Sequence, residues 1–126
     1  MAQTLVRTRN LVVSNGVLYL KSWVDGSTIY FNVGFSHNSG NYYQGYGLVG
    51  IVQRYVNGSW TEIERKQGGP YWVTQNSGVT FAFTGYVKKN TPVRIKLGIA
   101  PGSTAGSGYF THNGVFSWYY MPQFTL

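Results

Sequence analysis

Hydrophobic and polar residues alternate along most of the chain, and windows of about eleven residues lack the three-and-four spacing of an amphipathic helix. Alternation places every second side chain on the same face of a β-strand. The alternating runs are separated by two-residue turn signals at four places: Asn15-Gly16, Asp25-Gly26, Asn57-Gly58 and Asn113-Gly114. Such dipeptides supply the positive φ angles of a type I′ turn, so each predicts a β-hairpin. The pattern therefore predicts an all-β protein.

The first two turn signals predict a three-stranded meander. Closing the chain on Asn15-Gly16 pairs Leu11 with Leu20, and closing it on Asp25-Gly26 pairs Leu20 with Phe31. Both registers put the same apolar residues on one face, whereas a slip of one residue would scatter them. The expected core face consists of Leu11, Val13, Leu18, Leu20, Ile29, Phe31 and Val33.

The opposite face of the meander is aromatic and polar. The expected cross-strand pairs on it are Tyr19 with Asn32, Lys21 with Tyr30, and Trp23 with Thr28. Such a face is either an exposed platform or a surface covered by a second layer or subunit. Homo-oligomerisation through Tyr19, Trp23 and Tyr30 is one form of the second alternative.

The third hairpin turns at Asn57-Gly58. Its expected pairs are Tyr55 with Trp60, Gln53 with Glu62, and Val52 with Ile63.

Two further alternating runs, 79–83 and 93–99, each put apolar side chains on one face, and the second run puts Arg94 and Lys96 on the opposite face. A last hairpin around Asn113-Gly114 is expected to pair Tyr109 with Trp118, and the Trp118 side chain is expected on the core face.

About eight or nine strands are thus expected in a single β domain, residues 1–126. So many strands pack as two sheets or close on themselves. We predict a two-sheet antiparallel β-sandwich of immunoglobulin-like or jelly-roll type, with a small β-barrel as the alternative.

The composition argues against catalysis on chemical grounds. The only carboxylates are Asp25, expected in a turn, and Glu62 and Glu64, expected on one face of a strand about 7 Å apart. A glycosidase pair flanks the substrate bond instead. The two histidines, His37 and His112, stand apart and there is no cysteine, which leaves no triad and no zinc site. We expect no enzymatic activity, no metal and no cofactor.

Binding chemistry is concentrated in expected loops at 36–47 and 67–78, while a third loop, 100–108, is small and flexible. Tyrosine and tryptophan offer ring faces for the C–H faces of sugars, and asparagine and serine offer uncharged hydrogen bonds. The candidate ligand-binding residues are Asn41, Tyr42, Tyr43, Tyr46, Tyr71 and Trp72. Alternatively, these side chains cover the open end of a sandwich.

The net charge of +7 adds a second expectation, because so basic a protein attracts polyanions. The candidate anion-binding residues are Lys88, Lys89, Arg94 and Lys96. The partners considered are a glycan or an anionic cell-surface polymer, and an anionic membrane surface. Nucleic acid is not expected, since the chain lacks the RNP and cold-shock signatures.

We therefore predict a non-enzymatic, lectin-like protein that binds glycan or cell-envelope polymer. One alternative is a cationic antimicrobial or membrane-active protein that uses the aromatic stretch 115–124. The other is a self-assembling virion or phage subunit. The start lacks signal-peptide features, which fits either a virion component made inside the cell or a mature secreted domain. A surface rich in uncharged polar residues favours an extracellular or virion-associated location.

Overall fold

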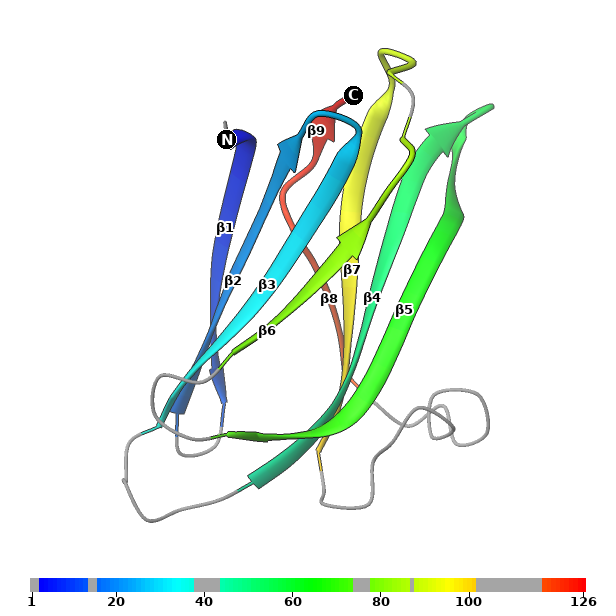
Figure 1. Ribbon diagram of the computed structural model, residues 1–126. Helices are drawn as coiled ribbons and strands as arrows, with labels where there is room; N and C mark the ends of the chain where they lie inside the picture. Colours follow the sequence, from blue (N-terminus) through cyan, green and yellow to red (C-terminus); the bar gives the residue numbers. More distant parts are fainter. Residues whose placement is uncertain (1–2, 14–15, 38–43, 74–77, 87, 102–116) are drawn as a thin grey trace.

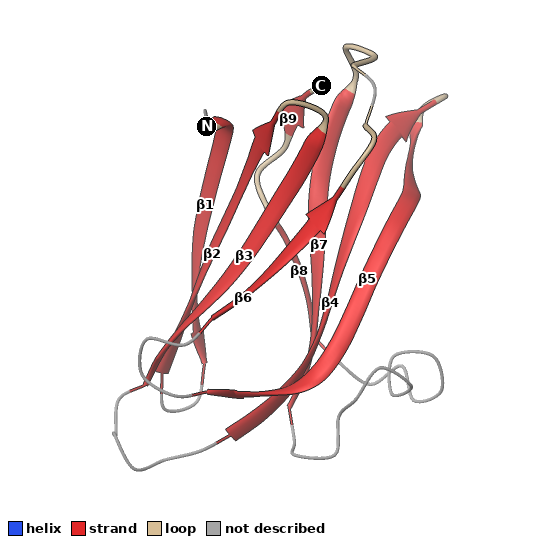
Figure 2. Cartoon of the chain, in the orientation of Figure 1, coloured by secondary structure: helices blue, strands red, loops and turns tan. Residues whose placement is uncertain are grey.

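The computed structural model describes residues 3–13, 16–37, 44–73, 78–86, 88–101 and 117–126. Every regular element in these residues is a β-strand (Figure 2). The strands are β1 (Thr4–Val13), β2 (Gly16–Asp25), β3 (Thr28–His37), β4 (Gln44–Val56), β5 (Ser59–Val73), β6 (Gly78–Phe83), β7 (Pro92–Pro101), β8 (Ser117–Tyr120) and β9 (Phe124–Thr125). This part of the chain contains no helix that is long and apolar enough to cross a membrane.

The strands form two antiparallel sheets that face each other (Figure 1). One sheet has the order β1-β2-β3-β6, and the other has the order β5-β4-β7-β8 with β9 also pairing with β7. Among the described strands no ladder joins one sheet to the other, so the alternative of a closed barrel is wrong and the β-sandwich is confirmed.

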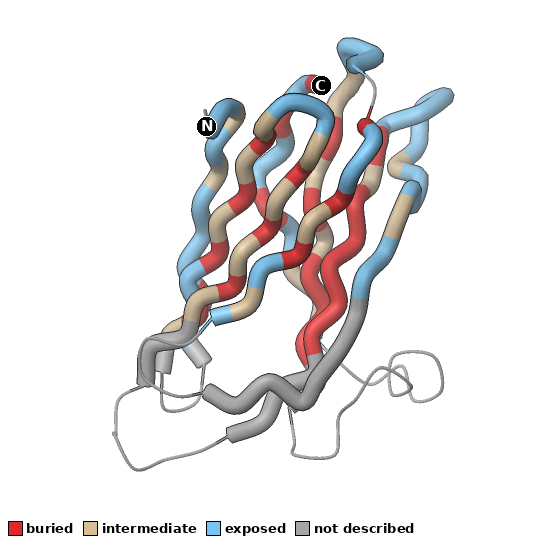
Figure 3. Tube along the Cα trace, viewed as in Figure 1, coloured by how far each residue is buried: buried red, intermediate tan, exposed pale blue. Residues whose placement is uncertain are grey.

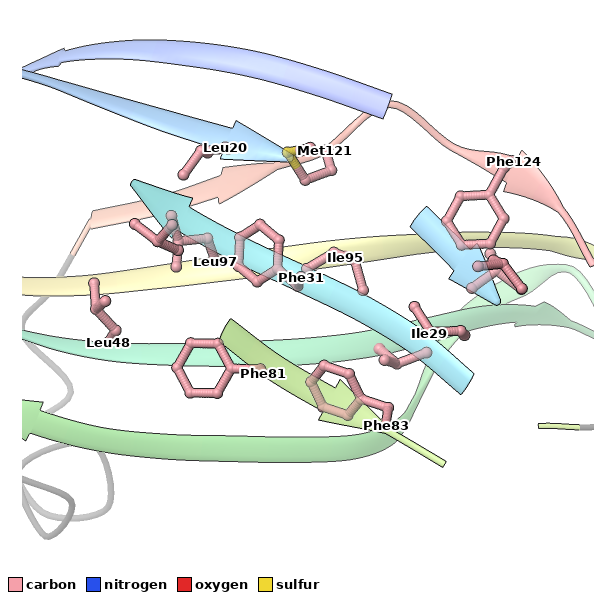
Figure 4. Close-up of a cluster of buried hydrophobic side chains, with 14 of the residues drawn as sticks. Leu20, Ile29, Phe31, Leu48, Phe81, Phe83, Ile95, Leu97, Met121 and Phe124 are labelled. Atoms are coloured by element: carbon pink, nitrogen blue, oxygen red, sulfur yellow. The ribbon is translucent and has the colours of Figure 1, made fainter. Parts of the chain in front are cut away.

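The space between the sheets is filled by the apolar side of each strand. Buried and less buried residues alternate along the strands (Figure 3). Phe81 and Phe83 of one sheet lie beside β4 of the other (Figure 4), and the ring centres of Phe31 and Phe81 are 6.3 Å apart. A Cβ on Gly50 of β4 would lie 3.3 Å from the Phe31 ring, so a residue without a side chain makes room for this aromatic cluster.

The predicted core face of the meander is confirmed, although its registers are wrong by two residues. Leu11 pairs with Leu18 rather than Leu20, and Leu20 pairs with Val33 rather than Phe31. An even shift leaves each side chain on its face, because side chains alternate with a period of two. The buried residues of the predicted face are Leu11, Leu18, Leu20, Ile29, Phe31 and Val33, while the side chain of Val13 lies outside the described part.

The second turn explains part of this shift. Asp25 pairs with Thr28, so the two loop residues are Gly26 and Ser27 instead of Asp25 and Gly26. Gly26 has a φ of 63°, and a glycine with positive φ in the first loop position is typical of a type II′ turn. Asp25 therefore ends a strand and does not form the turn.

The third hairpin turns at Asn57 and Gly58 as predicted, with φ angles of 51° and 84°. The predicted pairs Tyr55 with Trp60 and Gln53 with Glu62 are confirmed.

Beyond these two pairs the register shifts, so Val52 pairs with Glu64 and not with Ile63. The extra residue in β5 is a β-bulge, which turns Glu62 and Glu64 to opposite faces. The expectation that they share a face is wrong for this reason.

The strands extend into the segments expected as loops. β3 continues to His37, β4 begins at Gln44 and β5 continues to Val73. A second register shift, between Tyr46 and Leu48, lets the β4–β5 ladder continue past the glycines of β5. The expected loop 100–108 also begins later, because β7 ends at Pro101.

Trp118 lies on the outward face of its sheet, and the expectation that it faces the core is wrong. It pairs with outward-facing Gly98, while Tyr119 pairs with Leu97 and packs against the core. Every second residue of β7 is apolar and points into the core. Because paired residues lie on the same side of a sheet, this pattern also decides which side chains of β8 point inward. Tyr109, its expected partner, lies outside the described residues.

Two arginines join the edge strand β1 to the C-terminal segment of the other sheet. Arg7 Nε donates to the Gln123 carbonyl at 3.0 Å, and an Arg9 guanidinium N–H donates to the Tyr120 carbonyl at 2.7 Å. These hydrogen bonds join the two sheets at one side of the sandwich. They do not involve the outward faces of the sheets.

Candidate functional site

Aromatic rings and cations alternate across the outward face of the β5-β4-β7-β8 sheet. The guanidinium carbon of Arg94 lies 4.2 Å from the ring centre of Trp60 and 4.1 Å from that of Tyr120. The Lys96 ammonium lies 4.4 Å from the ring centre of Trp118 and 5.6 Å from that of Tyr120. We call these five residues, Trp60, Arg94, Tyr120, Lys96 and Trp118, the cationic ladder.

Apolar and charged residues alternate in the first half of β7, and this alternation puts the two cations of the ladder on one face. Its apolar residues point into the core, which leaves Arg94 and Lys96 on the outward side, as the sequence predicted. Lys96 pairs with Tyr120 of β8, and Arg94 pairs with Gln53 of β4. The ladder therefore spans the sheet from β5 to β8 because β7 and β4 lie between them.

Arg94 is held in one orientation by its neighbours. Its Nε–H donates to Gln53 Oε1 at 2.8 Å, and its guanidinium carbon lies over the rings of Trp60 and Tyr120. A guanidinium has five N–H donors, and stacking on rings leaves its edge able to bond. The arrangement is thus a pre-oriented donor for a carboxylate or phosphate group.

The electrostatics of this face are positive. Among the described residues of this face, Arg65 and Glu62 form an ion pair. Two guanidinium N–H groups of Arg65 donate to the Glu62 carboxylate at 2.8 and 3.0 Å. The hydrogen bonds from Arg65 lower the pKa of Glu62, and the same bonds raise the pKa of Arg65. Arg94 and Lys96 lie beside this pair with no carboxylate within 4 Å among the described residues.

Tyr55 continues the aromatic surface toward the end of the β4–β5 hairpin. Its ring meets the Trp60 ring edge-on, with centres 5.4 Å apart and planes at 70°. Tyr55 and Tyr120 are both 41% exposed, so ring area remains available beside the cations.

The four predicted anion-binding residues do not form one cluster. Arg94 and Lys96 belong to the cationic ladder, whereas Lys88 and Lys89 lie in the β6–β7 connection. The latter two line a pocket of about 680 Å³ together with residues of β1, β2 and the C-terminal segment. These four cations are close together along the chain, but in the structure they form two separate groups.

The predicted ligand-binding residues are partly brought together. Tyr46 pairs directly with Tyr71, and Trp72 pairs with Gly45, so three of the candidates meet where β4 begins and β5 ends. The side chains of Tyr46, Tyr71 and Trp72, and all of Asn41, Tyr42 and Tyr43, lie outside the described part of the structure.

Three members of the ladder were missed as binding candidates. The sequence patterns predict Trp60 only as a hairpin partner, Trp118 as a core residue, and Tyr120 as part of an aromatic stretch. The alternation along each strand could have placed the side chains of Trp60 and Arg94 on the outward face. Their proximity depends on β4 pairing with β7, which no local pattern specifies.

Among the described residues, Glu64 forms a second carboxylate contact, with Tyr86. Glu64 accepts a hydrogen bond from the Tyr86 hydroxyl at 3.1 Å, on the opposite side of β5 from Glu62. Burial, followed by the nearby charge of Glu64, raises the pKa of Tyr86, so this phenol stays neutral. Within the described residues, no group of three or more His, Cys, Asp and Glu side chains could hold a metal ion.

Comparisons of the chain with protein-family models, with curated proteins and with solved structures found no match. The interpretation of the site therefore rests on its own residues.

Proposed function

We propose that this protein is a non-enzymatic binding protein for an anionic glycan or cell-envelope polymer, which lies across the cationic ladder. The observation that carries the proposal is the guanidinium of Arg94 over the rings of Trp60 and Tyr120, with Lys96 over Trp118 beside it. Carboxylate and phosphate are the groups that such a guanidinium edge binds with two parallel hydrogen bonds.

The rings contribute mainly by pre-orienting the cations. A free arginine or lysine loses side-chain entropy when it binds, and that loss weakens affinity. Stacking on Trp60, Tyr120 and Trp118 removes part of that freedom before the ligand arrives. Exposed ring area on Tyr120 then offers contact to the C–H groups of a sugar.

The geometry favours an extended ligand. Arg94 and Lys96 are two residues apart on one strand, so their stems lie about 7 Å from each other. Lys96 pairs with Ile51, and Tyr46 stands five residues before Ile51 on β4, which is about 17 Å. A linear polymer lying along β4 would reach from the ladder to the strand end that carries Tyr46, Tyr71 and Trp72.

The proposal is tested by titrating polygalacturonate and a glycerol-phosphate teichoic acid against the protein by calorimetry, with pullulan as the neutral polymer. We expect Arg94→Gln and Lys96→Gln each to raise the Kd for an anionic polymer about tenfold, the equivalent of about 1.4 kcal/mol. Arg94→Lys keeps the charge but loses the planar stack and the paired donors, so we expect an intermediate loss.

Lys66→Gln is the matched control, because it removes one exposed lysine charge outside the ladder. Equal losses in Lys66→Gln and Lys96→Gln would show attraction by net charge alone and contradict the proposal. A larger loss in Lys88→Gln/Lys89→Gln would move the anion site to the β6–β7 connection. Tighter binding to single-stranded DNA than to either polymer would overturn the assignment to a glycan.

A further inference from the structure

The outward face of the β1-β2-β3-β6 sheet contains a notch without side chains. Tyr19 of β2 pairs with Gly34 of β3, and Gly34 pairs with Gly78 of β6. Paired residues point to the same side of a sheet, so two neighbouring outward positions hold glycine. Tyr19 stands beside them and is 46% exposed.

Asn32 forms another wall of this notch. Its Nδ2 donates to Thr80 Oγ1 at 2.8 Å and to the Val79 carbonyl at 3.2 Å, which fixes the orientation of the amide. Its Oδ1 points to the notch, since it lies 3.8 Å from the place where a Cβ on Gly34 would be. Two hydrogen bonds on the outward face thus hold an acceptor in place next to an exposed ring.

A second aromatic unit lies along the same two strands. The rings of Trp23 and Tyr30 are stacked with centres 5.3 Å apart and planes at 14°. The Lys21 ammonium lies 5.3 Å from the Trp23 ring centre. The charged residues at outward positions of the described part of this sheet are Lys21 and Asp25, which sum to zero.

We propose that this face is a second site, which takes a neutral carbohydrate. A sugar ring lies in the notch over Gly34 and Gly78 with its C–H face against Tyr19, and a hydroxyl donates to Asn32 Oδ1. The stacked Trp23 and Tyr30 rings contact a further sugar unit. The absence of net charge distinguishes the ligand from the anionic polymer of the cationic ladder, and the two sites share no residue.

Gly34→Val is the decisive variant because it fills the notch without straining the fold. The nearest heavy atom to an added Cβ is 3.6 Å away, and the φ of Gly34 is not in the left-handed region. Valine suits a strand position. Thr61→Val on β5 of the other sheet is the matched control for adding a β-branched apolar residue to an exposed strand position.

The readout is ¹⁹F NMR of protein labelled with 5-fluorotryptophan, whose four tryptophan signals are assigned with Trp→Phe variants. The probes are cellohexaose, chitohexaose, mannohexaose and maltohexaose. We expect one of them to shift the Trp23 signal saturably, equally at low and high salt, and to leave the Trp60 and Trp118 signals in place. Gly34→Val is expected to weaken this binding at least about tenfold, the equivalent of about 1.4 kcal/mol.

Three outcomes would overturn the proposal: no response of Trp23 to any of the four probes, a response that Gly34→Val leaves unchanged, or a Trp23 signal that changes with protein concentration alone. The last result would show that a second copy of the chain covers this face. Polygalacturonate added to the same sample reports on Trp60 and Trp118, so failure of this site and failure of the cationic ladder are distinguished.

Discussion

Tyr86 is a buried residue in the connection between β6 and β7, and its chemistry is decided by its surroundings. Its main-chain N–H donates to the Ser27 carbonyl at 2.8 Å and its hydroxyl donates to Glu64 at 3.1 Å. Burial and the Glu64 carboxylate both disfavour the phenolate, which raises the pKa of Tyr86 above its ordinary value of 10. The residue links the end of the first sheet to β5 of the second.

This shift predicts a specific loss of stability in alkali. A pKa that is higher in the folded than in the unfolded protein gives stability that is complete below pH 10 and decreases as the pH rises above it. The decrease attributable to one group is at most about 1.4 kcal/mol per pH unit. We expect the unfolding free energy of Tyr86→Phe to fall less steeply between pH 10 and 11.5 than that of the wild type, as measured by urea unfolding.

Tyr55→Phe is the control, because Tyr55 is exposed on the outward face and loses only its hydroxyl. Parallel stability curves for the wild type and Tyr86→Phe above pH 10 would contradict this assignment.

The two glutamates at this end of β5 illustrate the limit of residue-scale inference. The sequence shows that Glu62 and Glu64 are two apart, which on a regular strand means one face. The bulge at Ile63 reverses this, so that one glutamate bonds Arg65 outside and the other bonds Tyr86.

At the scale of elements, the packing of β8 on β7 depends on Gly98. A Cβ at this position would lie 2.5 Å from Val49 Cγ1 and 2.7 Å from the Trp118 ring. Both neighbours would have to move, and Trp118 carries the Lys96 contact of the cationic ladder. The glycine therefore couples the stability of the sheet to the geometry of the proposed site.

We expect Gly98→Ala to lower the unfolding free energy by about 1–3 kcal/mol, the usual cost of overpacking, and to weaken binding of polygalacturonate. Urea unfolding and calorimetry measure the two effects. Gly34→Ala is the matched control, because an added Cβ there meets only ordinary contacts at 3.6 Å. A change of similar size in both variants would show a general cost of replacing strand glycines.

On the scale of the whole molecule, the two aromatic faces lie on opposite sides of the sandwich (Figure 1). The cationic ladder lies on the outward side of one sheet, and the notch at Gly34 lies on the outward side of the other. If both are occupied, the protein joins two different polymers. The two-layer core lies between them, and no described residue belongs to both sites.

This arrangement predicts bridging without competition. Beads coated with polygalacturonate are expected to retain the neutral hexasaccharide identified by ¹⁹F NMR only when the protein is present. The Kd for each ligand is expected to change by less than about twofold when the other site is saturated, because distant sites with no shared partners behave additively. Displacement of one ligand by the other would show a single shared surface.

High salt separates the two attachments in the same assay. The anionic contact weakens as salt rises, because exposed charges are screened, whereas the neutral contact is unaffected. Release of the protein from the beads in salt, with the hexasaccharide still bound to it, is the expected result.

The class of fold and the face of most side chains could be predicted from local sequence patterns. Alternation and turn chemistry act within a few residues, so the all-β fold, the core face of the meander and the outward direction of Arg94 and Lys96 followed from local patterns. Even the two-residue errors in register preserved these faces, since the period of a strand is two.

Which strands are neighbours, and therefore which side chains meet, could be read only from the folded chain. Trp60, Arg94 and Tyr120 come from three strands separated by long stretches of chain, and they are joined because β4 pairs with β7 and β7 with β8. The bulge at Ile63 and the glycine notch beside Tyr19 likewise depend on pairing between strands. Such pairing minimises the free energy of the whole core, in which contacts distant in sequence outweigh any local preference.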